Sequence, residues 1–245
     1  MISAPILAAI VAVFVVGAGL QRIAGLGLGL VVAPILTLML GPATGVTLSN
    51  AAAVLTTVLV LGALRHDVDW PEVRRLAPLI VVGSGFGAVA VRLLNTAWLE
   101  TLIGVSILGA LALTFAADGR VQLRGRAVAM AAGSIGGFMN ATAGVAGPAM
   151  AIYAVATRWE QRSFAATLQP ILLTANLTAL AGKGLVGSFP VNELVAWPIG
   201  IALVCAVPAG VVAGGFLKRW VDNRRARHVA IVIAGLGGIV TLIRG

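Results

Sequence analysis

The sequence predicts an all-α, polytopic membrane protein that forms a single transmembrane domain over residues 1–245. Hydrophobic residues make up 60% of the chain and charged residues only 10%, with a mean hydropathy of +1.05. A soluble domain carries about 25% charged residues, so this chain cannot cover a globular surface. Residues 23–64 form a charge-free stretch of 42 residues. At about 20 residues per crossing, this stretch suffices for two crossings of a bilayer.

The predicted membrane elements follow from the charge-free runs in chain order. The first run, 1–21, has no basic segment before it, so we expect a retained span and not a cleaved signal peptide. Glycine and proline break the run 23–64 near its beginning and at its middle. The run 127–157 is too long for one ordinary span and too short for two, and its central glycines predict a broken, re-entrant hairpin. The remaining runs each fit a single element: 76–91, 101–117, 163–182, 194–217 and 229–243.

The basic residues predict the orientation of the chain. If 127–157 enters the membrane and returns, 14 of the 17 Lys and Arg residues fall on one side. Only Arg92, Lys183 and Arg244 fall on the other. By the positive-inside rule the first side is the cytoplasm, and both termini face the periplasm. The net charge of +9 is thereby explained without a nucleic-acid partner.

The same count predicts two inverted repeats, about 1–117 and 127–243. Each repeat contains five membrane elements, namely a Gly/Pro-broken hairpin plus about three transmembrane helices. Because five is an odd number, the second repeat enters the membrane from the opposite side and is inverted relative to the first. Faint echoes occur at an offset of 119: Gly25 with Gly144, Thr44 with Ser163, Asn50 with Gln169 and Thr57 with Asn176. Inverted repeats with broken elements are typical of secondary transporters, whose substrate lies near the midplane between the breaks.

Ionisable residues are absent from the predicted membrane interior. All eight Asp and Glu residues fall in loops or at span ends, whereas cation and proton carriers usually keep a carboxylate in the membrane. Both histidines lie in loops, and the single cysteine, Cys205, lies in an apolar run. We therefore expect no metal site, no cofactor and no intramembrane hydrolase.

Neutral polar residues and glycines remain as candidates for a binding site. Amides donate hydrogen bonds to an oxyanion without presenting negative charge, and half-helix N-termini add backbone donors. Arg22 is the candidate for charge compensation. Such amides can also simply bond to a neighbouring helix, and Arg22 or Lys183 can extend to the interface. The predicted substrate-binding residues are Arg22, Gly25, Gly27, Gly29, Asn50, Asn140, Gly144, Gly147, Pro148, Gln169 and Asn176.

Three segments resemble signatures of the TauE/SafE family of sulfite and organosulfonate exporters. They are the glycine-rich segment 17–34, the segment 136–153 around Gly147-Pro148, and the segment 162–167. The resemblance covers essentially the whole chain in the expected order. It implies a multi-pass permease of the bacterial cell membrane, built from two related halves, that moves small sulfur-containing anions. The chain departs from the family pattern at Leu26, where an aromatic is common, and at Ala146, where Ser is frequent.

Three functions are compatible with the sequence. The first is a non-enzymatic anion permease that works by alternating access, with a small anion and membrane lipid as its partners. The second is a membrane enzyme acting on a lipid or polyprenyl phosphate, which would need clustered charged residues at one depth. The third is an anion channel or an accessory subunit without carrier activity.

Overall fold

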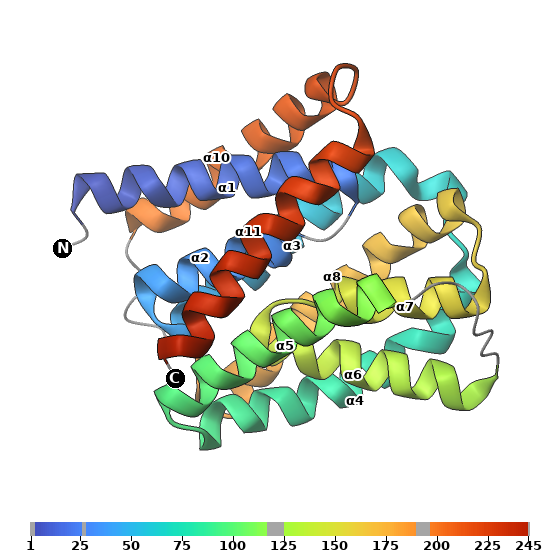
Figure 1. The fold of residues 1–245 in the computed structure, drawn as a ribbon, viewed down its shortest axis with the longest axis horizontal. Coiled ribbons are helices and arrows are strands. Elements are labelled where there is room, and N and C mark those ends of the chain that lie inside the picture. Colours follow the sequence, from blue (N-terminus) through green and yellow to red (C-terminus); the bar gives the residue numbers. More distant parts are fainter. Residues whose placement is uncertain (1–2, 26–27, 117–124, 190–196, 245) are drawn as a thin grey trace.

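The computed structural model describes residues 3–25, 28–116, 125–189 and 197–244, and these form ten α-helices and one 3-10 turn (Figure 1). No strand occurs in these ranges. The helices are α1 (Ala4–Ala24), α2 (Gly29–Leu40), α3 (Pro42–Leu64), α4 (Trp70–Leu93), α5 (Thr96–Ala116), α6 (Arg126–Ala143), α7 (Gly147–Thr157), α8 (Gln161–Leu185), α10 (Trp197–Leu217) and α11 (Asn223–Arg244), and the turn is η1 (Arg65–Asp67).

The prediction of an all-helical polytopic membrane protein is confirmed. Within the described ranges, six helices are long and apolar enough to cross a bilayer: α1, α3, α4, α8, α10 and α11. Many of the exposed side chains are large and apolar, such as Phe86, Ile201 and Val232. In water such a surface would be costly, whereas against hydrocarbon it is the favourable arrangement.

Two glycines break the chain where the sequence predicts it. Gly25 ends α1 with φ 72°, and Gly144 ends α6 with φ 73°. Glycine adopts this left-handed conformation without the steric cost of a Cβ atom, so it commonly ends helices. Each break leads into a short helix, α2 of 12 residues and α7 of 11. The division of the chain into two inverted repeats stays a prediction.

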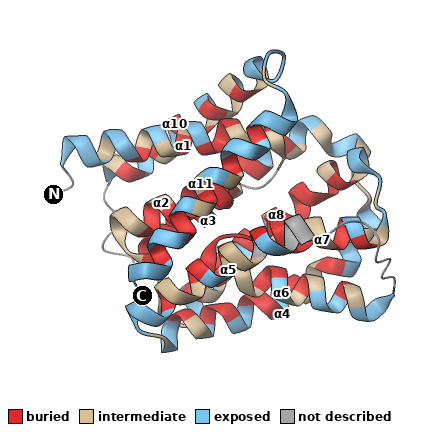
Figure 2. Cartoon of the chain, viewed as in Figure 1, coloured by how far each residue is buried: buried red, intermediate tan, exposed pale blue. Residues whose placement is uncertain are grey.

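Helices α3 and α8 form the centre of the molecule. More than half of the apolar window of each is buried, 56% and 61%, against 28–39% for the four other long helices. Helix α3 packs directly on α8. Figure 2 shows buried residues along the inward-facing sides of the helices and exposed ones on their outward faces.

Glycines allow two pairs of helices to approach closely. Helix α4 packs along α6, and α1 packs along α10. A methyl group added at Gly83 or Gly137 would overlap the backbone of the facing helix in the first pair, and one at Gly210 would do so in the second. Small residues at such crossings are how membrane helices gain packing energy in lipid. Figure 1 shows the two pairs on opposite sides of the molecule.

The two ends of the helix bundle differ in charge. At one end, called here the basic end, Arg162 pairs with Asp67 at 3.0 Å, and Arg158, Arg224 and Arg227 line one open pocket. At the opposite end, called the terminal end, Arg92 donates to the carbonyl of Gly187, and Arg244 donates to that of Leu38. Both chain termini lie at the terminal end, on the left of Figure 1.

Candidate functional site

The two chain breaks touch. Gly29, the first residue of α2, lies so close to the carbonyl oxygen of Gly144 that a methyl group at Gly29 would overlap it. A methyl group added at Gly144 would lie 2.9 Å from the Cβ atom of Ala33 on the other side of the contact. The sequence places these breaks 119 residues apart, and the fold brings them together.

A small pocket lies at this contact. Both short helices present their first turns to it: Gly29 and Leu30 from α2, and Gly147 and Pro148 from α7. The first backbone N–H groups of a helix lack partners within it and carry a positive partial charge. At 1.5 Å per residue, α2 and α7 extend about 18 Å and about 16 Å from opposite ends of the bundle, so their beginnings lie near mid-depth.

The pocket is nearly closed. It leaves about 10 Å³ for the centre of a water molecule, which is room for about one water. Its remaining lining comes from α1, α3, α6, α8 and the break after α6: Gln21, Leu28, Ala53, Asn140, Gly144, Val145, Ala146, Leu172 and Asn176. None of the described residues that line it is charged.

Gln21 holds the first break in place. Its Oε1 accepts a hydrogen bond of 2.6 Å from the backbone N–H of Leu28, so the α1 side chain fixes the start of α2. Its Nε2 donates to Oε1 of Gln169 on α8 at 3.4 Å, and Gln169 in turn donates to the carbonyl of Ala165. Both glutamines are buried. Gln21 is absent from the residues predicted from sequence.

Three asparagines from three helices meet on the other side of the pocket. Nδ2 of Asn140 on α6 donates to Oδ1 of Asn176 on α8 at 3.1 Å. Nδ2 of Asn50 on α3 donates to the backbone carbonyl of Asn140 at 3.5 Å. All three are buried. The structure thus brings together four predicted amide residues, these three and Gln169, around the meeting point of the breaks.

The contacting amide residues form two pairs that the sequence offset of 119 relates to each other. Adding 119 to Gln21 gives Asn140, and adding 119 to Asn50 gives Gln169. The contact between Gln21 and Gln169 therefore has a counterpart in the contact between Asn140 and Asn50. The offset in the sequence was a signal that could have identified Gln21.

Two buried polar atoms at the site have no hydrogen-bond partner among the described residues. They are Oγ of Ser49 and Oδ1 of Asn50. Each lies 3.6 Å from the position that a Cβ atom on Gly144 would take. Unsatisfied buried polar atoms are uncommon and mark places where a ligand can bond.

The remaining predicted residues lie elsewhere. Arg22 lies against α10, with its Cβ atom near Gly214, and does not line the pocket. Gly25 lines a larger pocket at the basic end, about 530 Å³ by the same measure, together with Arg158, Arg224 and Arg227. Gly27 lies outside the described residues.

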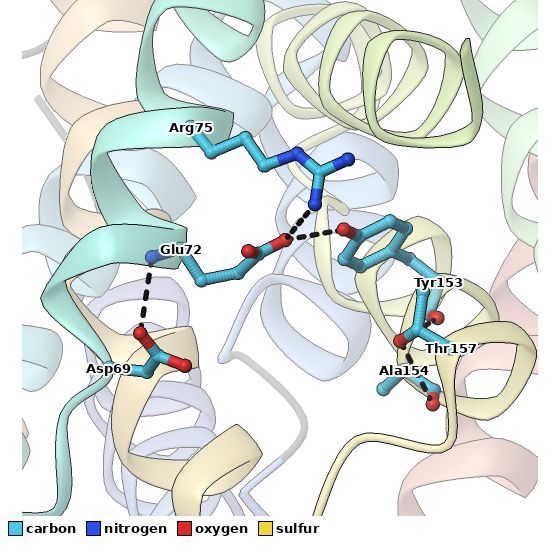
Figure 3. Close-up of polar contacts among 6 residues, drawn as sticks. All are labelled: Asp69, Glu72, Arg75, Tyr153, Ala154 and Thr157. Carbon is cyan, nitrogen blue, oxygen red and sulfur yellow. Dashed lines mark hydrogen bonds and ion pairs between the residues drawn. The ribbon is translucent and has the colours of Figure 1, made fainter. Parts of the chain in front are cut away.

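A polar cluster at the basic end anchors α7. Tyr153 donates a short hydrogen bond from its hydroxyl to Glu72 in the first turn of α4, and Arg75 lies 3.6 Å from the same carboxylate (Figure 3). The Asp69 carboxylate caps α4 by accepting a hydrogen bond from the backbone N–H of Glu72. The backbone N–H of Asp69 donates to the hydroxyl of Thr167 on α8. These bonds fix the short helix α7 to α4, and the start of α4 to α8.

Glu160 begins the helix that follows. Its carboxylate accepts hydrogen bonds from the backbone N–H groups of Ser163 at 2.8 Å and Arg162 at 2.9 Å. These two bonds, Ser163 first, lower the pKa of Glu160 below its usual value. Among the described residues no group of three or more His, Cys, Asp or Glu side chains could hold a metal ion.

Comparison with known proteins identifies the family of the chain. The family model described as Sulfite exporter TauE/SafE matches residues 9–241, which is nearly the whole chain and contains both breaks. No curated protein and no solved structure matches the chain. Members of this family are membrane exporters of sulfite and related sulfur compounds, and the described helices are those of a multi-pass membrane protein. The chain belongs to the TauE/SafE sulfite exporter family.

Proposed function

We propose that the protein is a secondary transporter that carries a small sulfur-containing anion, such as sulfite or an organosulfonate, across the bacterial cell membrane by alternating access. The family supports the sulfur-compound class of substrate. The observation that carries the proposal is the meeting of two half-helix N-termini and a set of uncharged amides at one buried pocket.

The site favours an anion over a cation. Each helix N-terminus is equivalent to roughly half a positive charge, and α2 and α7 both begin at the pocket. The amides of Gln21, Asn140 and Asn176 can donate hydrogen bonds as well as accept them. A cation would find no carboxylate among the described lining residues.

The two unsatisfied polar atoms suit an oxyanion that carries a proton. The hydroxyl of Ser49 can donate to a sulfur-bound oxygen, and Oδ1 of Asn50 can accept from an S–O–H group. Hydrogen sulfite offers both kinds of group. A sulfonate offers acceptors alone and would leave Oδ1 of Asn50 unpaired.

Transport requires the pocket to open alternately to the two sides. Room for about one water molecule is too little for an ion of four heavy atoms. The large pocket that contains Gly25 and three arginines is the entrance from the basic end. By the positive-inside rule that end faces the cytoplasm and both termini face the periplasm. The equivalent amide pairs support two inverted halves.

The membrane potential supplies a driving force for export. Moving one negative charge out of a cell with a negative interior yields about 2.3 kcal/mol per 100 mV. No coupling carboxylate is needed for this, which is consistent with the absence of acidic residues from the pocket lining.

The test is counterflow in proteoliposomes. Vesicles loaded with unlabelled sulfite should accumulate radiolabelled sulfite faster than empty vesicles, and sulfoacetate should be assayed in parallel. Saturable flux that internal substrate stimulates identifies a carrier, whereas flux without such stimulation identifies a channel. If neither sulfite nor a sulfonate moves faster than in protein-free vesicles, the proposal is wrong.

Two substitutions test the site. Asn50→Ala and Asn140→Ala should each reduce counterflow at least about tenfold. Thr178→Val is the matched control, because its hydroxyl bonds only to carbonyls of its own helix, at Thr174 and Ala175. Normal counterflow by both asparagine variants would place the binding site elsewhere.

A further inference from the structure

Lys183 is a buried cation inside the membrane-spanning region. It lies in the last turn of α8, and its exposed fraction is 0%. Its Nζ donates to Oγ1 of Thr47 on α3 at 3.2 Å. In the described parts of the chain no carboxylate pairs with this ammonium group, and Thr47 is its one hydrogen-bond partner.

The ammonium group has donors to spare. Lysine carries three N–H donors, and one is used on Thr47. The hydroxyl of Thr47 gives its own proton to the carbonyl of Ala43 at 2.6 Å, so its oxygen faces Lys183 as an acceptor. When the group is protonated, two further N–H donors remain for another ligand.

The side chain points toward the membrane interior. Helical side chains lean toward the N-terminus of their helix, which for Lys183 is the direction of Asn176. Lysines near span ends normally extend the other way, so that the ammonium group reaches water. The complete burial of Lys183 excludes that arrangement here.

Lys183 continues the polar face of α8 that forms the site. Gln169, Asn176 and Lys183 are spaced by seven residues, which is about two helical turns and about 10 Å at each step. All three are buried. On α3, Thr47 precedes Asn50 by about one turn. The α3–α8 contact therefore carries a line of polar groups from the amide site to the terminal end.

Burial of a charged group without a countercharge is costly, and such groups inside membranes are retained for function. The basic end already has three arginines on the open pocket. The corresponding position of Lys183 in the first half is Leu64, so this cation is not a feature repeated by the internal symmetry. The neutral amide site thus lies between Lys183 at one end and, at the other, a pocket lined by three arginines and by the carboxylate of Asp222.

We propose that Lys183 forms a second anion-binding site, on the terminal side of the amides, which pairs with the transported oxyanion as it passes between α3 and α8. This inference rests on the proposed function. The ligand class is a small oxyanion whose negative charge replaces the missing countercharge. Thr47 positions the ammonium group and does not itself need to touch the ion.

The experiment compares Lys183→Met, which keeps the length of the side chain and removes its charge, with Lys183→Arg. Sulfite counterflow in proteoliposomes should fall at least about tenfold in Lys183→Met and remain within about threefold of wild type in Lys183→Arg. Lys218→Met is the matched control, because Lys218 is exposed at the basic end, and it should transport normally. Counterflow by Lys183→Met within twofold of wild type would overturn the inference.

A binding measurement separates this inference from the proposed function. Sulfite should raise the melting temperature of the detergent-solubilised wild type, and the increase should be smaller in Lys183→Met and in Thr47→Val. If wild type binds sulfite but shows no counterflow, the transport proposal fails. The role of Lys183 is then decided by whether sulfite raises the melting temperature less in Lys183→Met than in wild type. An equal shift in wild type and Lys183→Met, or no shift in wild type, would refute a second anion site. Thr47→Val keeps the test available if Lys183→Met does not fold.

Discussion

Gly29 of α2 and Gly144 at the end of α6 lie in backbone contact, with no space for a methyl group between them. This contact joins two chain breaks that are more than a hundred residues apart, and it forms one wall of the pocket. Both short helices that begin here depend on it for their position.

Gly29→Ala should therefore disturb both stability and transport. Overpacking of this kind costs about 1–3 kcal/mol, and for a chain of this length each kcal/mol lowers the melting temperature by roughly 2–4 °C. Counterflow should be lost as the pocket walls separate. Gly62→Ala on α3 is the matched control, since an added methyl group there meets no atom within 4 Å. Equal melting temperatures for the two variants would contradict the contact.

Gln21→Glu tests whether the pocket binds a negatively charged ion. The carboxylate can still accept the N–H of Leu28, but it loses the bond that Nε2 donates to Gln169 and places a negative charge beside the pocket. Sulfite counterflow should fall by at least about a hundredfold. Asn95→Asp makes the same chemical change at the start of α5, where an acid caps as well as an amide, and should transport normally. Retained transport in Gln21→Glu would argue against an anion at this pocket.

Tyr153→Phe should release α7 from α4. A hydrogen bond to a charged group contributes about 1.5–3 kcal/mol, so the melting temperature should fall by roughly 3–12 °C. Thr157→Val on the same helix is the control, because the hydroxyl of Thr157 bonds to carbonyls of its own helix, at Tyr153 and Ala154 (Figure 3). A double-mutant cycle with Glu72→Gln should show coupling between the two positions, and additive effects would contradict the link.

Glu160→Ala should lower the melting temperature at pH 7, and this difference from wild type should shrink as the pH falls into the acidic range. The folded protein holds the pKa of Glu160 below its usual value, chiefly through the N–H of Ser163. Its stabilising effect is therefore present above the unfolded-state pKa and disappears as the pH falls through the folded-state pKa. The difference between wild type and variant should close over this acidic range. A difference that does not change with pH would show that the cap does not act through its charge.

The sequence predicted the parts of the site that depend on local chemistry. Glycines that end helices and a lack of acids are visible residue by residue, so Gly144, Asn140 and Asn176 could be placed at a neutral pocket. The sequence alone did not show which of Gln21 and Arg22 faces the pocket. Neighbouring helical residues point about 100° apart, and only the position of α10 decides which of the two faces inward. The structure turns Gln21 to the pocket and Arg22 to α10.

The burial of Lys183 could not be predicted for a related reason. A lysine near the end of a span can reach water or turn inward, and the local sequence permits both. The outcome depends on α3, which supplies Thr47 and covers the ammonium group. Contacts between segments distant in sequence decide such cases.

The packing of α1 on α10 and of α6 on α4 has a mechanical consequence. The first helix of each proposed repeat is locked to a helix of the other repeat, so the chain cannot work as two blocks that rock along the repeat boundary. If transport proceeds by the alternating access proposed above, the rigid bodies that part to admit an ion must each contain helices from both proposed repeats. The boundary between the two bodies then runs beside α3 and α8. The glycine-rich α1–α10 and α4–α6 contacts each stay within one body and do not separate during the movement.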